Sequence, residues 1–135
     1  METALPDDVL EFLKRANPAV MATLAKDGRP VTVATWYLLQ EDGAVLLNLD
    51  AERVRLAHIR RDPRIALTVL DGDDWGSHVS LQLVVTAVHD DETKQDIDAL
   101  ATHYTGSPYP DRERPRVSAL AEIRSWHGWG TFAAS

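Results

Sequence analysis

Short apolar runs separated by tight-turn residues restrict this chain to a fold made mostly of antiparallel strands. Lys26-Asp27-Gly28-Arg29 and Glu41-Asp42-Gly43 each stand between two apolar segments. Asp-Gly in such a place is the strongest short-range signal of a β-hairpin, and a tight hairpin joins antiparallel neighbours. The pattern predicts strands over residues 19–25, 31–39, 44–49, 64–70, 77–88 and 117–126.

Three other segments have helical spacing. Residues 6–16 begin with Pro6 and two acids and repeat apolar side chains at the helical interval. Residues 52–61 and 91–104 are also predicted as helices, and the Pro-rich residues 105–116 as a loop. We therefore expect a mainly β (α+β) fold with six antiparallel strands in meander order and short flanking helices. A twisted sheet of this size avoids free edges by closing into a barrel.

Length and composition bound the remaining possibilities. A chain of 135 residues without repeats or linkers suits one domain, residues 1–135. Its 44% hydrophobic and 26% charged residues exclude a disordered chain, and the lack of cysteine excludes thiol chemistry. No apolar run is long enough to cross a membrane, and residues 1–8 are acidic without an apolar signal core. We expect a cytoplasmic protein without membrane partners.

Charge is distributed unevenly along the chain. The net charge of −7 disfavours nucleic-acid partners, which require several cations on one face. Residues 51–64 nevertheless carry a local charge of +3, so that the remaining chain carries −10. A basic segment in an acidic protein indicates a small anionic ligand. The arginines of this segment are Arg53, Arg55, Arg60, Arg61 and Arg64.

The familiar catalytic and metal-binding patterns are missing from the sequence. The five histidines include no close metal-ligand pair and no H-E-x-x-H, so no metal site is predicted. There is no G-x-S-x-G motif and no evident acid–base pair. The catalytic residues are therefore unknown, and in an enzyme of this kind a cofactor would supply the difficult chemistry.

Arg53 and Arg55 have two interpretations. They lie where a strand runs into a helix N-terminus, and free N–H groups together with guanidinium groups favour an anion there. Residues two apart do not share a helix face, so both reach one ligand only if Arg53 belongs to the bend before the helix. The alternative, which spacing alone favours, is a solvated basic helix paired with acids elsewhere. Arg60, Arg61 and Arg64 fit helix C-terminal charge and a surface pair with Asp62.

This segment resembles the pyridoxine-5'-phosphate-oxidase-like split β-barrel family, and within it the deazaflavin branch that uses coenzyme F420. Members carry Asn or Ser, then Arg-x-Lys/Arg, a helix ending in Arg-Arg-Asp-Pro-Arg, and an apolar strand. The similarity spans roughly residues 10 to 130 and includes the first hairpin. The matching residues are Asn48, Arg53, Arg55, Arg60-Arg61-Asp62-Pro63-Arg64, Ile65-Ala66-Leu67, Ala22-Thr23-Leu24, Asp27-Gly28-Arg29-Pro30, Thr35-Trp36-Tyr37 and Asp73-Asp74-Trp75.

The resemblance implies a six-stranded antiparallel split β-barrel of the FMN-binding type, assembled as a homodimer with cofactor sites at the interface. By position, Arg53 and Arg55 would hold the cofactor phosphate, Val54 between them would belong to the same cofactor site, and Asn48 and Leu49 would line the ribityl chain. A further set of residues would contact the cofactor ring. Some of them belong to the second strand, and the others would approach from the opposite side of the ring and could come from the second chain. This set comprises Val33, Ala34, Thr35, Trp36, Trp75, Ser77 and His78.

The resemblance implies an F420-dependent oxidoreductase that transfers a hydride between the deazaflavin and an unsaturated or oxidised organic acceptor. Two alternatives share the fold: an FMN-dependent enzyme like pyridoxamine-phosphate oxidase, and a non-enzymatic carrier of flavin or haem. The four tryptophans leave further alternatives. Trp36 faces a ring pocket or only packs, whereas Trp126 and Trp129 are expected to bury the C-terminal segment on the barrel or on a dimer partner.

Overall fold

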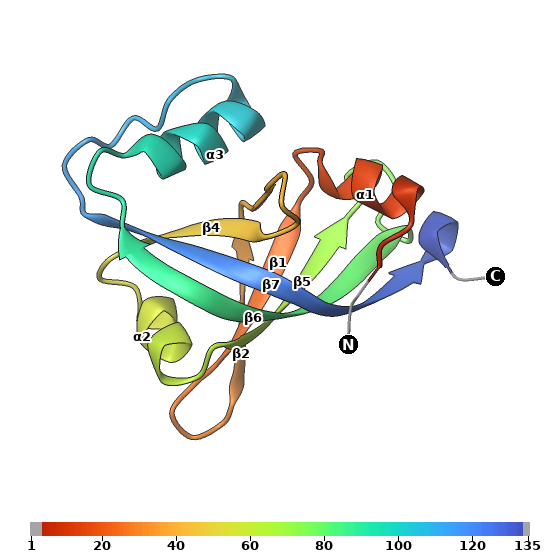
Figure 1. Ribbon diagram of the computed structural model, residues 1–135, viewed down its shortest axis with the longest axis horizontal. Helices are drawn as coiled ribbons and strands as arrows, with labels where there is room; N and C mark the ends of the chain where they lie inside the picture. Colours follow the sequence, from red (N-terminus) through yellow and green to blue (C-terminus); the bar gives the residue numbers. More distant parts are fainter. Residues whose placement is uncertain (1–3, 134–135) are drawn as a thin grey trace.

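The computed structural model describes residues 4–133 (Figure 1). Residues 1–3 of the acidic N-terminal segment lie outside the described residues. The helices are α1 (Asp7–Leu13), α2 (Val54–Arg61) and α3 (Gln95–Thr105), with a 3-10 turn, η1 (Gly130–Phe132), after the last strand. The strands are β1 (Ala19–Leu24), β2 (Pro30–Thr35), β3 (Leu38–Leu39), β4 (Val45–Asp50), β5 (Arg64–Leu70), β6 (His78–Asp90) and β7 (Arg116–Trp129).

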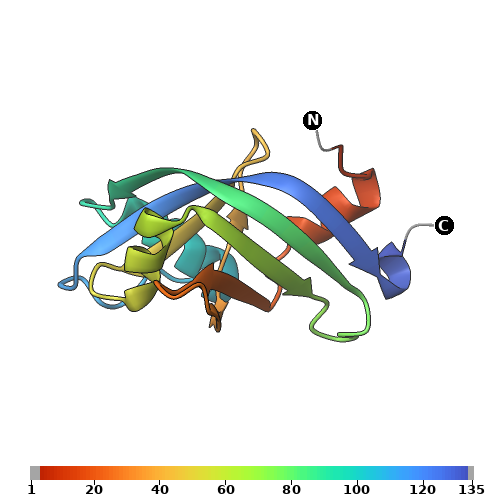
Figure 2. The same ribbon diagram turned by 90° about the horizontal axis from the view of Figure 1, so that it is seen from below.

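All seven strands form one antiparallel sheet in the order β2-β1-β5-β6-β7-β4-β3. The sheet is strongly twisted but its two ends are not hydrogen-bonded to each other (Figure 2). The expected mainly β fold is therefore confirmed. The expected closure by hydrogen bonding and the simple meander order are wrong, since only β5, β6 and β7 follow one another as a meander.

The expected single strand over residues 31–39 is wrong in one respect: the chain leaves the sheet at Trp36 and Tyr37 and divides it into β2 and β3. Tyr37 is 1% exposed, and its hydroxyl donates to the Leu13 carbonyl oxygen at 2.8 Å and accepts from the Asn17 side chain at 2.9 Å. Binding the Tyr37 side chain to the end of α1 interrupts the pleat. The sheet consequently has seven strands, with β2 and β3 at its opposite ends.

The core lies inside the curve of the sheet, and a second, smaller apolar layer lies beneath α3. Every residue of β4 is buried because one face of the strand meets the core while the other meets α3 and the loop that follows it. Val45, Leu47 and Leu49 belong to the core, whereas Asn48 takes part in polar contacts on the α3 side. A strand covered on both faces is nearly continuous in apolar residues, and residues 44–49 are apolar except for Asn48.

The start of α3 differs from the sequence prediction, which placed it at residue 91. The helix begins at Gln95, and Asp91 instead accepts hydrogen bonds from the backbone N–H groups of Asp96 and Ile97 at 3.1 and 2.9 Å. Free N–H groups of a first turn need such acceptors. Asp91 therefore anchors α3 above β4. Within the described residues, no helix is long and apolar enough to cross a bilayer.

Candidate ligand-binding cavity

A cavity of about 580 Å³ lies between the edge of the sheet, α2 and α3. Its lining combines guanidinium groups at one side with aromatic rings at another. Five of the residues that were predicted to bind a cofactor line it, and the lining also includes two tyrosines and an arginine that the sequence did not indicate. The predicted ones are Ala34, Thr35, Trp36, Asn48 and Arg55, and the additional ones are Tyr104, Tyr109 and Arg116.

Three aromatic side chains form one wall of the cavity. The rings of Trp36 and Tyr104 are stacked, with centroids 5.3 Å apart and planes inclined by 15°, and Tyr109 meets Trp36 edge-on at 6.4 Å. The Tyr104 hydroxyl donates to the Asn17 carbonyl oxygen at 2.7 Å, and burial raises the pKa of Tyr104 to about 12. Tyr104 is therefore a neutral, fixed surface at physiological pH. Trp36 lines the cavity and also packs against Tyr104 and Tyr109, so it does not serve packing alone.

The bend before α2 places the charge of Arg53 close to Arg55, and Arg55 lines the cavity. Arg53 is the N-cap residue and has an extended backbone, with φ −74° and ψ 141°, so it belongs to the bend and not to the helix. Arg55 lines the cavity, and its Nη1 is buried without a hydrogen-bond partner among the described residues. Burial first, then the positive charges of Arg53 and Arg116, lower the pKa of Arg55. A buried donor without an acceptor is costly, and an anion in the cavity would supply that acceptor.

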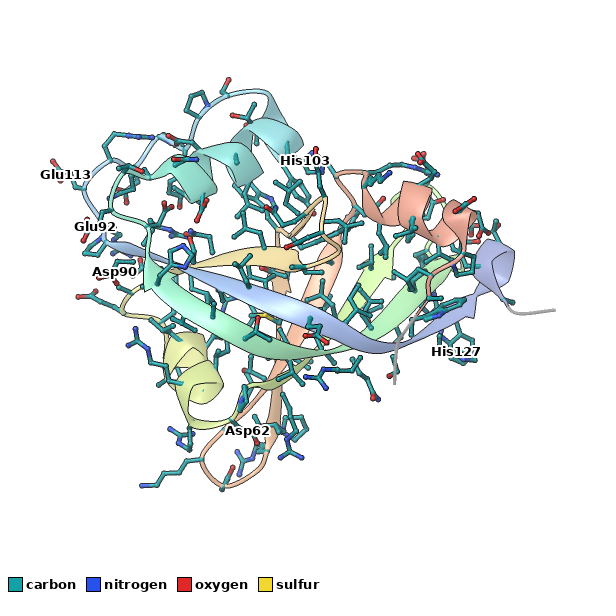
Figure 3. The ribbon with its side chains drawn as sticks, in the orientation of Figure 1. Asp62, Asp90, Glu92, His103, Glu113 and His127 are labelled. Atoms are coloured by element: carbon teal, nitrogen blue, oxygen red, sulfur yellow. The ribbon has the colours of Figure 1, made fainter. Side chains whose placement is uncertain are left out.

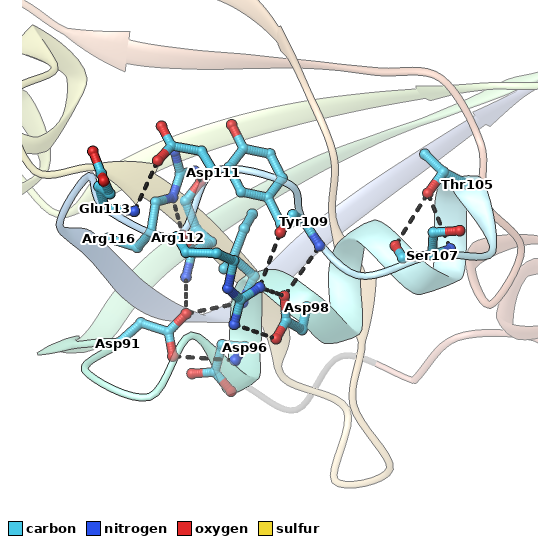
Figure 4. A network of polar contacts seen from close by, with 12 residues as sticks. Asp91, Asp96, Asp98, Thr105, Ser107, Tyr109, Asp111, Arg112, Glu113 and Arg116 are labelled. Carbon is cyan, nitrogen blue, oxygen red and sulfur yellow. Dashed lines mark hydrogen bonds and ion pairs between the residues drawn. The ribbon is translucent and has the colours of Figure 1, made fainter.

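A polar network links the cavity to the base of α3 (Figure 4). The Arg116 Nε donates to Asn48 Oδ1 at 2.8 Å, and the Asn48 Nδ2 donates to Asp91 Oδ2 at 3.1 Å and to Ser118 Oγ at 3.1 Å. The Arg116 guanidinium also lies 5.1 Å from the centroid of the Tyr109 ring. Asn48 is thus fixed at both ends of its amide, and it orients Arg116 toward the cavity.

Four predicted residues near this site do not line the cavity. Leu49 points into the hydrophobic core. Arg53 is exposed, and Val33 and Val54 are 37% and 68% exposed. The phosphate-binding role of Arg53, the place of Val54 in the cofactor site and the ring contact of Val33 remain predictions.

Trp75, Ser77 and His78 belong to a different cluster beside the C-terminal turn. The backbone N–H of Thr131 donates to Ser77 Oγ at 3.0 Å, and the ring of His78 stacks on Trp129 at 5.6 Å. Trp75 and Trp129 are 76% and 49% exposed, whereas Trp126 packs against the core. Within one chain these predicted ring contacts do not reach the cavity, and their contribution from a second chain remains a prediction.

Histidines and acids outside the cavity are dispersed. Figure 3 shows Asp62, Asp90, Glu92, His103, Glu113 and His127 spread over several elements. Among residues 4–133, no three His, Asp or Glu side chains come together in a way that could hold a metal ion. His58 is buried and lies 2.8 Å from the Thr23 hydroxyl through its Nδ1, which fixes α2 on β1.

The sequence did not indicate Tyr104, Tyr109 and Arg116 because their place depends on long-range pairing. Arg116 reaches the cavity because β7 runs beside β4, with Asp50 opposite Arg116 and Asn48 opposite Ser118. Two tyrosines close to a Pro-rich loop were the only signal that the loop could contribute rings. The sequence does not show which way these rings point until the position of α3 is known.

Solved structures with the same fold include an F420 reductase, with a TM-score of 0.81 and 22% identity over 90% of this chain and 98% of the other. A conserved hypothetical protein from Mycobacterium tuberculosis has a TM-score of 0.68 and 22% identity, with 93% and 85% covered. A heme-binding protein from Mycobacterium smegmatis has a TM-score of 0.68 and 18% identity, with 94% and 55% covered. These likenesses confirm the split-barrel fold.

No curated protein sequence gives a significant match to the chain. A family model does: the model described as pyridoxamine 5'-phosphate oxidase matches residues 5–130. This match spans the first helix, every strand and the whole of the cavity. The chain therefore belongs to the pyridoxamine 5'-phosphate oxidase family.

Proposed function

We propose that this protein is a coenzyme F420-dependent oxidoreductase that passes a hydride between the deazaflavin and an unsaturated or oxidised organic acceptor. The observation that carries the proposal is the buried Arg55 Nη1, which lacks an acceptor and borders a cavity with an aromatic wall. The reduced deazaflavin, when bound, supplies the hydride.

The residues of the cavity fit a ligand with a flat ring and an anionic tail. Arg55 would hold the phosphate group, with Arg53 adding positive charge from the bend. Trp36 and Tyr104 present stacked faces against which a planar ring system can pack. Thr35 and Ala34 would meet the ring from β2. The described residues place no carboxylate in the lining, so a proton for the acceptor would come from water.

The fold similarity to an F420 reductase supports F420 over FMN as the cofactor. An FMN-dependent enzyme is the second candidate, favoured by the family to which the chain belongs. A non-enzymatic flavin or haem carrier is the third, and the similarity to a heme-binding protein favours it. An enzyme oxidises its reduced cofactor when an acceptor is added, whereas a carrier does not.

A homodimer is part of the proposal. Val33, Val54, Trp75 and Trp129 are large apolar side chains exposed on the single chain, and a second copy would cover such residues. In that assembly Trp75 and His78 could approach the cavity of the partner. Light scattering coupled to size-exclusion chromatography measures the mass directly, and a monomer at all concentrations would contradict this part. A protein using a diffusible cofactor of this kind is expected to act in the cytoplasm on a small-molecule acceptor.

The deciding experiment is a titration of the protein with F420 and with FMN, followed by tryptophan fluorescence. Trp36 lies in the cavity and reports on occupancy, and Trp36→Phe identifies its share of the signal. We expect F420 to bind at least about tenfold more tightly than FMN. Arg55→Ala should weaken F420 binding by about 1.5–3 kcal/mol, the scale of a hydrogen bond to a charged group. Equal, weak binding of both cofactors that Arg55→Ala leaves unchanged would refute the proposal.

A further inference from the structure

Arg116 lines the same cavity as Arg55 but comes from a different element of the fold. It is the first residue of β7, and it is half-buried among the lining side chains. The arginine motif that identifies the α2 segment does not include it. Its position in the cavity therefore requires its own explanation.

The conformation of Arg116 is fixed without an ion pair. Its Nε donates to Asn48 Oδ1 at 2.8 Å, its Nη2 lies 3.4 Å from the Asn48 carbonyl oxygen, and the Tyr109 ring covers one face. All of these are neutral partners. Among the described residues, no carboxylate lies within ion-pair distance of Arg116, although its charge contributes to the lowered pKa of Asp50, the residue opposite it in β4. The side chain is thus held in place as a cation with spare charge.

The two cavity arginines affect each other. Arg116 is one of the two positive charges that lower the pKa of Arg55. Like charges that share a low-dielectric site raise the free energy of the empty protein. A protein tolerates such an arrangement where a ligand of opposite charge relieves it.

We propose that Arg116 is a ligand-contacting cation, so that the anionic group of the ligand is held between Arg55 of α2 and Arg116 of β7. The inference rests on the cavity of the proposed function and adds a specificity residue to it. Since two guanidinium groups face one anion, the site favours a group with more than one negative charge, such as a phosphate or pyrophosphate, over a single carboxylate. Asn48 acts as a positioning residue because it orients Arg116.

The experiment uses inorganic pyrophosphate and FMN as probes, with binding measured by calorimetry and by Trp36 fluorescence. Arg116→Met is compared with Arg114→Met. Arg114 lies two residues before β7, pairs with Asp50 and does not line the cavity. We expect Arg116→Met to weaken both probes at least about tenfold and to reduce the dependence of affinity on salt. Arg114→Met should leave both affinities within about twofold.

A second variant guards against misfolding. Arg116→Lys keeps the charge but loses the planar fork, so it should bind with intermediate affinity and with the salt dependence of the unmodified protein. Unchanged pyrophosphate affinity in Arg116→Met would overturn the inference, as would failure of the unmodified protein to bind either probe. If pyrophosphate binding depends on Arg116 while F420 does not bind, the inference stands and the proposed cofactor is wrong. If F420 binds equally to the unmodified protein and to Arg116→Met, the proposed cofactor stands and the inference about Arg116 is wrong.

Discussion

Three arginines of one loop and strand start, at alternate positions, make a direct comparison. Arg112 pairs with Asp98 at 2.6 Å and Arg114 pairs with Asp50 at 2.7 Å, whereas Arg116 donates to the neutral amide of Asn48 at 2.8 Å. The first two guanidinium groups are neutralised and stabilise the loop against α3 and β4. The third keeps its charge and faces the cavity. Replacing a carboxylate partner by an amide thus turns a structural arginine into one available to a ligand.

Giving Arg116 a carboxylate partner should make it resemble Arg112 and Arg114, and this change should have the largest effect on ligand binding. In Asn48→Asp, the new carboxylate would lie beside the Arg116 Nε and neutralise it, so pyrophosphate affinity should fall at least about tenfold. The same carboxylate would face Asp91, whose Oδ2 now accepts from Asn48, and the protein should lose about 2 kcal/mol of unfolding free energy. Calorimetry and urea denaturation measure the two effects.

The matched control for this variant is Gln82→Glu, which adds a negative charge on an exposed part of β6 away from the cavity. It should change neither the affinity nor the unfolding free energy appreciably. Unchanged pyrophosphate affinity in Asn48→Asp, in a protein that is still folded, would show that the charge of Arg116 does not serve the ligand.

Removing a cavity arginine and removing a paired arginine should change the free energy of unfolding in opposite directions. Arg55→Met removes a half-buried cation that has no carboxylate partner, so the ligand-free protein should gain about 0.5–1 kcal/mol of unfolding free energy. Arg114→Met should instead lower the stability, because the Asp50 side chain, only 6% exposed, loses its ion-pair partner. Urea denaturation of both variants without ligand measures the signs. A larger loss in Arg55→Met than in Arg114→Met would make Arg55 a structural residue.

Local signals in the sequence predicted most of the fold and the part of the site that lies in one segment. The Asp-Gly turns predicted the hairpin of β1 and β2, and the spacing after residue 52 predicted α2. Asn48 and Arg55 lie within a few residues of each other, so one motif was enough to bring both to attention. Asn48 and Arg55 of this segment line the cavity, whereas Leu49, Arg53 and Val54 do not.

Features that depend on contacts between distant parts of the chain were not predicted from the sequence. The break at Tyr37 depends on hydrogen bonds to Leu13 and Asn17, which no periodicity within residues 31–39 reveals. Arg116 was assigned to a loop because its partner strand, β4, could not be identified without the strand order. Residue type alone also could not separate Arg112 and Arg114 from Arg116, since the difference lies in whether the side-chain partner is a carboxylate or the Asn48 amide.

The smallest expected effect is the acid dependence of the neutralised arginines. The backbone N–H of Glu52 and the Arg114 guanidinium hold the pKa of Asp50 below its usual range, although burial opposes them. The depressed pKa means that this stabilisation is complete above the unfolded-state pKa, about 3.9, and is lost as the pH falls through the folded-state value. The melting temperature of the protein should exceed that of Asp50→Asn at about pH 6, and the difference should shrink below about pH 4.

Asp62→Asn is the matched variant for this measurement. A hydrogen bond from the Arg64 side chain lowers the pKa of Asp62 to about 2, but the pair is exposed and does not anchor a buried strand. Solvent screens such a pair, so Asp62→Asn should change the melting temperature less than Asp50→Asn at every pH, and about 0.5 M salt should remove its effect. An equal, salt-resistant effect at both positions would mean that burial of Asp50 does not set the strength of its pair. Arg114 would then differ from Arg116 only in having a carboxylate partner, and the burial of that carboxylate in β4 would add nothing to the stability of the fold.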